Sequence, residues 1–130
     1  MAKSLSTILG IVFLVVGLLG FAAPGMMGRP LSTAHNVIHL ISGALALYSG
    51  ARGTYEAACG FCIILGLVYG FLGLIGFVAS GPDTMLTVIP NQLMFGKMDH
   101  IVHVMLSVLF IYAGLSTRPI SAAGVDGAGC

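Results

Sequence analysis

Charged residues are scarce in this 130-residue chain, and their scarcity is the most informative feature of its composition. Only 7% of the residues are Asp, Glu, Lys or Arg, whereas 58% are hydrophobic and the mean hydropathy is +1.07. A soluble domain carries about 25% charged residues because its surface must face water. The composition therefore excludes an ordinary soluble domain and predicts a protein whose surface faces a lipid bilayer.

Other missing features exclude further classes of protein. The five Lys and Arg residues are spread along the chain, and the formal net charge is +1, so there is no basic stripe for nucleic acid. The odd number of cysteines, three, without a regular framework argues against a disulfide-stapled scaffold. No G-x-x-x-x-G-K-[ST], G-x-S-x-G or H-E-x-x-H motif occurs. We therefore expect a protein that is not an enzyme and has no nucleic-acid partner.

Long apolar runs dominate what is present. Each of four runs is near the length of about 20 residues that crosses the hydrocarbon core as a helix. None alternates apolar and polar residues with a period of two, so helices are favoured over strands. We expect helices over about 5–23, 34–50, 56–80 and 98–115. The predicted fold class is all-α, a four-helix transmembrane bundle in one domain (1–115), followed by a flexible Gly-rich tail (116–130).

The two halves of the chain resemble each other. Residues 8–25 align with residues 64–81 at a constant offset of 56, with Phe13 opposite Tyr69. Residues 38–50 align with residues 102–114 at an offset of 64, which places His39 opposite His103. We interpret this pattern as two parallel repeated helical hairpins, related by an axis along the membrane normal. The first run also fits a cleaved signal peptide, but its place in the repeat favours a retained helix.

The few basic residues give an expected orientation. Lys3, Arg52 and Arg118 lie on one side of the predicted bundle, and Arg29 and Lys97 lie on the other. The positive-inside rule therefore predicts that both termini are cytoplasmic.

Polar residues gather where the second and fourth predicted helices begin. All four histidines of the protein lie in these two segments. Polar groups at membrane depth are costly and usually face the bundle interior. The predicted polar intramembrane cluster consists of His35, Asn36, His39, Asp99, His100 and His103.

Three interpretations of this cluster remain open. The side chains can hydrogen-bond across helices and organise the bundle, which would suit an accessory subunit of a membrane complex. Imidazoles on facing helices can bind a metal ion or haem, with the four histidines His35, His39, His100 and His103 as ligands. Histidines together with Asp99 can also form a transporter or proton relay. The expected partners are the lipid bilayer and either further copies of the chain or a larger complex.

Two segments carry a resemblance to a known family. His35-Asn36-Val37-Ile38-His39-Leu40-Ile41-Ser42-Gly43 resembles the H-N-x-x-H-L-x-x-G segment of a family of small four-helix bacterial membrane proteins of unknown function. Asp99-His100-Ile101-Val102-His103 is similar to the D-N-x-x-H segment of that family, with His100 in place of Asn. The resemblance implies a multi-pass protein of the bacterial inner membrane and implies no activity.

Overall fold

The structure, a computed structural model, describes residues 1–25, 32–80, 85–90 and 92–116. The predicted flexible tail lies outside these residues apart from Ser116, and so do Arg29 and Arg118. Four helices and two short strands are present in the described part: α1 (Ala2–Ala22), α2 (Thr33–Ala51), α3 (Tyr55–Ala79), β1 (Leu86–Ile89), β2 (Leu93–Phe95) and α4 (Lys97–Leu115). The helices coincide with the four apolar runs to within one residue, except that α1 begins three residues earlier.

Polar side chains next to the apolar runs define where the helices begin. The Ser32 hydroxyl accepts from the backbone N–H of His35 and caps α2, and the Thr54 hydroxyl caps α3 in the same way. The polar first turn of α1 is held against the α2–α3 turn, because the Lys3 ammonium donates a hydrogen bond to the carbonyl of Gly53 at 2.8 Å. This bond explains why α1 begins before its apolar run.

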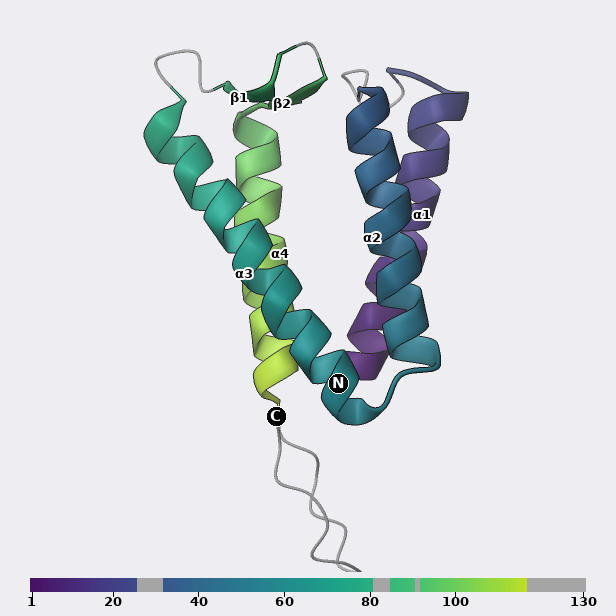
Figure 1. The fold of residues 1–130 in the computed structure, drawn as a ribbon. Coiled ribbons are helices and arrows are strands. Elements are labelled where there is room, and N and C mark those ends of the chain that lie inside the picture. The colour runs from purple at the N-terminus through teal and green to yellow at the C-terminus, as the bar shows by residue number, and fades with distance from the viewer. Residues whose placement is uncertain (26–31, 81–84, 91, 117–130) are drawn as a thin grey trace, which may run out of the picture.

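The helices pack as two pairs. α1 packs along α2 and α3 packs along α4, and the pairs meet at the end that holds the N-terminus and the α2–α3 turn (Figure 1). At that end the Ser6 hydroxyl and the Cys62 thiol, on α1 and α3, lie 3.2 Å apart and are both buried. The pairs diverge toward the opposite end, which we call the wide end (Figure 1).

Close backbone approach joins α1 to α2. A Cβ atom built on Gly10 would lie 2.5 Å from the backbone nitrogen of Leu47 and 3.0 Å from the carbonyl oxygen of Gly43. Small residues at a helix crossing allow such an approach, which is typical of helices packed in membranes.

Three of the four helices, α1, α3 and α4, are long and apolar enough to cross a membrane. The sequence predicted four such helices, and α2 differs because His35, Asn36 and His39 occupy its first two turns. By its own composition α2 is therefore less apolar than the other three helices.

The two strands correct the all-α prediction, because they lie between the predicted helices 56–80 and 98–115, where we expected no further secondary structure. β1 and β2 pair in antiparallel orientation with Leu86 opposite Phe95 and Ile89 opposite Leu93, and the register is irregular between Thr87 and Ile89. The backbone N–H of Gln92 donates to the carbonyl of Ile89 at 3.0 Å and closes the turn. Short β-branched stretches such as Thr87-Val88-Ile89 favour strands, but Pro and Gly on both sides hid this signal.

Candidate functional site

Six aromatic and imidazole rings form a closed series of contacts between the two helix pairs. They come from all four helices and from β2, so the series joins every described element except β1. We call it the aromatic–imidazole circuit, and its members are Phe13, His35, His39, Tyr69, Phe95 and His103.

The α1–α2 side of the circuit contains two histidines and one phenylalanine. His35 and His39 are one helical turn apart, so their rings share a face of α2 and stack with centroids 4.6 Å apart. The ring of His39 also lies 5.7 Å from that of Phe13 on α1. His35 is 7% exposed, and His39 is partly buried.

The α3–α4 side has a matching arrangement. Tyr69 on α3 stacks on His103 of α4 with centroids 5.3 Å apart and an interplanar angle of 29°. The Tyr69 ring lies 5.9 Å from Phe13, and its hydroxyl faces the side chain of Ser42 on α2. These contacts join the two helix pairs in the middle of the structure.

Phe95 of β2 closes the circuit at the wide end. Its ring contacts His35 edge-on at 5.3 Å and His103 edge-on at 5.0 Å, and the side chain is 4% exposed. Edge-to-face geometry is the favoured arrangement for such ring pairs. The hydroxyl of Ser32, which caps α2, donates to the carbonyl of Gln92, so the β-hairpin is bound to α2 at a second point.

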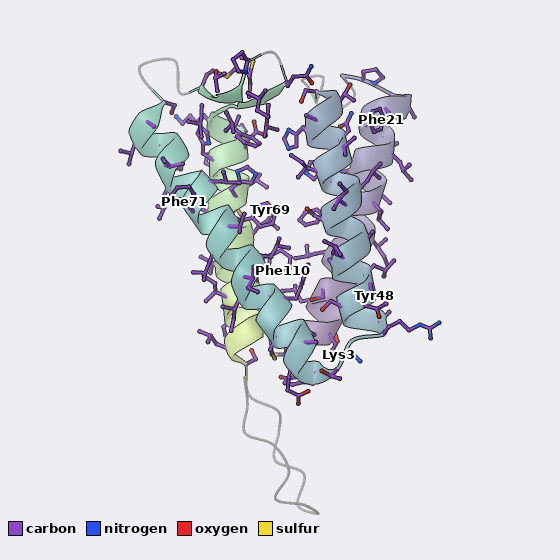
Figure 2. The ribbon with its side chains drawn as sticks, viewed as in Figure 1. Lys3, Phe21, Tyr48, Tyr69, Phe71 and Phe110 are labelled. Carbon is purple, nitrogen blue, oxygen red and sulfur yellow. The ribbon has the colours of Figure 1, made fainter. Side chains whose placement is uncertain are left out.

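An aromatic layer lies on the other side of the imidazoles, toward the end where the helix pairs meet. Phe110 is fully buried and stacks on Tyr69 at 6.1 Å with an interplanar angle of 11°, and it lies 6.4 Å from Phe13. Figure 2 shows Tyr69 and Phe110 directed toward α1 and α2, whereas Phe21 and Phe71 lie on the outside. The imidazoles therefore lie between this layer and the β-hairpin.

Two buried imidazole nitrogens in the circuit have no hydrogen-bond partner within the described part of the chain. They are Nδ1 of His39 and Nδ1 of His103, both buried. Asp99 is the one described carboxylate that interacts electrostatically with His35, His39 and His103. Its carboxylate accepts from the backbone N–H of Gly96 at 2.7 Å, which holds it in the first turn of α4.

The structure separates the other two members of the predicted polar cluster from the circuit. Asn36 is 1% exposed and abuts Gly20 within the α1–α2 contact. His100 is fully buried and abuts Gly76 within the α3–α4 contact, with the ring of Phe77 edge-on at 5.5 Å. The predicted cluster is thus three groups: the circuit with Asp99 beside it, Asn36, and His100.

Metal ligation by His35, His39, His100 and His103 stays a prediction. In the described residues no group of three or more His, Cys, Asp or Glu side chains is arranged to hold a metal ion. Sequence reasoning did not include Phe13, Tyr69 and Phe95 in the site. The one sequence signal for Phe13 and Tyr69 is that these aromatic residues occupy equivalent positions in the predicted repeat.

One comparison with known proteins identifies a family. Residues 26–116 match the family model described as a domain of unknown function (DUF4383), which covers more than half of the chain, and the chain belongs to this family. The expected likeness to an uncharacterised family is confirmed to that extent. No curated protein and no solved structure matches the chain.

Proposed function

We propose that this member of the DUF4383 family is a non-enzymatic protein of the bacterial inner membrane, in which the aromatic–imidazole circuit holds two membrane-spanning helical hairpins together. The observation that carries the proposal is that the circuit takes rings from all four helices and crosses between the two pairs twice, through Phe13 and Tyr69 and through His35 and Phe95.

Exposed apolar side chains on every helix support the membrane location. Leu18 on α1 is 59% exposed, Ile41 on α2 is 56%, Leu67 on α3 is 60% and Val108 on α4 is 64%. Monomeric soluble proteins rarely expose apolar surface on this scale, whereas a bilayer solvates it. Because the outward residues of α2 are as apolar as those of the other helices, we propose that α2 is the fourth spanning helix.

Contacts between equivalent residues support the two-hairpin repeat. Ser6 contacts Cys62, and Phe13 contacts Tyr69, and each pair is separated by the repeat offset of 56 residues. A residue that contacts its own equivalent lies at a two-fold axis, as in an isologous dimer interface. Such an axis would run between α1 and α3.

Contacts within each hairpin also recur at the repeat offsets. Gly20 abuts Asn36 in the first hairpin, and Gly76 abuts His100 in the second. The two glycines are 56 residues apart, and Asn36 and His100 are 64 apart. The same contact of a polar side chain with a glycine therefore occurs in both hairpins, which supports the proposed repeat.

The described charges support the proposed orientation. The N-terminus, the α2–α3 turn and the end of α4 lie at one end of the structure (Figure 1). Lys3 and Arg52 belong to this end, which the positive-inside rule makes cytoplasmic. With no catalytic motif and an apolar outer surface, the protein fits an accessory role within a homo-oligomer or a larger membrane complex.

The test is the double variant His39→Gln with His103→Gln. The two Gln side chains keep hydrogen-bonding groups but remove the imidazole rings that contact Phe13 and Tyr69. Each such ring contact contributes about 0.5–1.5 kcal/mol to stability beyond the area it buries. We expect a lower unfolding temperature in detergent, measured by circular dichroism. The matched control is Tyr48→Gln with Tyr112→Gln, because these rings are equally equivalent in the repeat but are 69% and 63% exposed. Equal unfolding temperatures for the two double variants would contradict the proposal.

Ligand binding by the circuit is the second candidate function, because Nδ1 of His39 and of His103 have no partner in the described residues. Metal analysis and an absorption spectrum of the detergent-purified protein distinguish ligand binding from the structural role. Stoichiometric metal or a haem band that disappears in the histidine double variant would replace the structural proposal with ligation. Proton flux into liposomes that depends on the same two histidines would replace it with a relay.

A further inference from the structure

We propose that the β-hairpin formed by β1 and β2 lies in the interfacial region of the bilayer, where lipid covers its exposed apolar side chains and so sets the membrane depth of the circuit. The inference rests on the proposed membrane function and adds a lipid-contacting surface to it.

The side chains of the β-hairpin favour contact with lipid. Leu93 and Phe95 are buried against the protein, whereas Val88 is 47% exposed, Ile89 is 48% and Met94 is 38%. No charged residue occurs between Met85 and Gly96. An uncharged hairpin with apolar side chains directed outward gains free energy by moving them from water into lipid.

The backbone of the β-hairpin is incompatible with a position in the hydrocarbon core of the bilayer. The described sheet has only two strands, so each strand has one edge along which no third strand pairs. Unpaired backbone N–H and C=O groups are not tolerated in hydrocarbon, but headgroups and water can pair with them at the interface. Apolar side chains and open strand edges are satisfied together only at the boundary between acyl chains and headgroups.

The position of the β-hairpin agrees with this depth. It lies at the wide end, where α3 ends and where α2 and α4 begin (Figure 1). Phe95 contacts both His35 and His103. If the hairpin lies at the interface, these two imidazoles lie directly beneath it, separated from it only by the ring of Phe95. The histidines would then be close to the headgroups rather than at the midplane of the bilayer.

The chain contains no tryptophan, so single-Trp variants report depth without background. We would place Met94→Trp and, separately, Val88→Trp in phosphatidylcholine vesicles whose acyl chains carry bromine either near the headgroup or near the chain end. We expect shallow bromine to quench both variants several-fold more strongly than deep bromine. The control is Leu67→Trp, 60% exposed in the middle of α3, for which we expect the reverse.

The outcomes separate failure of this inference from failure of the proposed function. If neither lipid quenches the Leu67→Trp variant, the bundle does not span the membrane and the proposed function fails. If Leu67→Trp is quenched but neither hairpin variant is, water or a partner strand added to the open edge covers the hairpin, and this inference alone is overturned. Stronger quenching of both hairpin variants by deep bromine would also overturn it.

Discussion

The contact between α1 and α2 allows a quantitative prediction for Gly10→Ala. The new Cβ would lie 2.5 Å from the backbone nitrogen of Leu47, 2.9 Å from its Cα and 3.0 Å from the carbonyl oxygen of Gly43. All three are backbone atoms, so no side-chain rotation can relieve the overlap. The helices would have to separate locally by about 1 Å, and such overpacking typically costs about 1–3 kcal/mol.

An opposing effect reduces the expected loss. Ala is more favourable than Gly inside a helix by about 0.5–1 kcal/mol. The difference between the two effects leads us to expect that Gly10→Ala lowers the free energy of unfolding by up to about 2.5 kcal/mol. The control is Gly60→Ala in α3, where a Cβ meets no atom within 4 Å and only the helix-propensity gain applies.

The assay is unfolding of both variants in the same detergent, followed by circular dichroism. A Gly10→Ala variant at least as stable as Gly60→Ala would refute the close packing of α1 on α2. A second comparison tests the backbone argument, since adding Leu47→Ala should not rescue Gly10→Ala. At Gly66 the nearest atom is instead the side-chain Cγ1 of Ile111, at 2.7 Å, so Ile111→Ala should partly rescue Gly66→Ala.

Two further predictions concern the wide end. Ser32→Ala should destabilise the protein more than Thr54→Ala does. Each variant loses a helix cap worth about 1 kcal/mol, but only the Ser32 hydroxyl also donates to the carbonyl of Gln92. Equal unfolding temperatures would mean that the hydrogen bond to the β-hairpin contributes nothing to stability. Phe95→Ala should destabilise by about 3 kcal/mol, because it removes a buried ring that contacts two imidazoles. Nuclear magnetic resonance of labelled histidines should then show changed signals from both, and unchanged signals would contradict the closed circuit.

Much of the helical framework could be predicted from the sequence because it depends on local properties. Apolar runs separated by Pro and Gly indicate helices, and hydroxyl residues such as Ser32 and Thr54 cap the beginnings of α2 and α3. Residues 86–95 could not be assigned in the same way. A two-stranded sheet depends on pairing across a turn and on burial of Leu93 and Phe95 against the helices, which a local pattern does not report.

The candidate site was predictable in part for the same reason. The sequence by itself determined that the histidines lie near the start of α2 and α4, because their positions in the apolar runs do not depend on packing. Only the tertiary structure decided which neighbours they have. Adjacent helical residues point about 100° apart, so His35 enters the circuit while Asn36 packs on Gly20. His103 and His100 both face α3, but His103 meets the ring of Tyr69 and also contacts Phe95 of β2, whereas His100 packs on Gly76, because a different residue of α3 lies opposite each position.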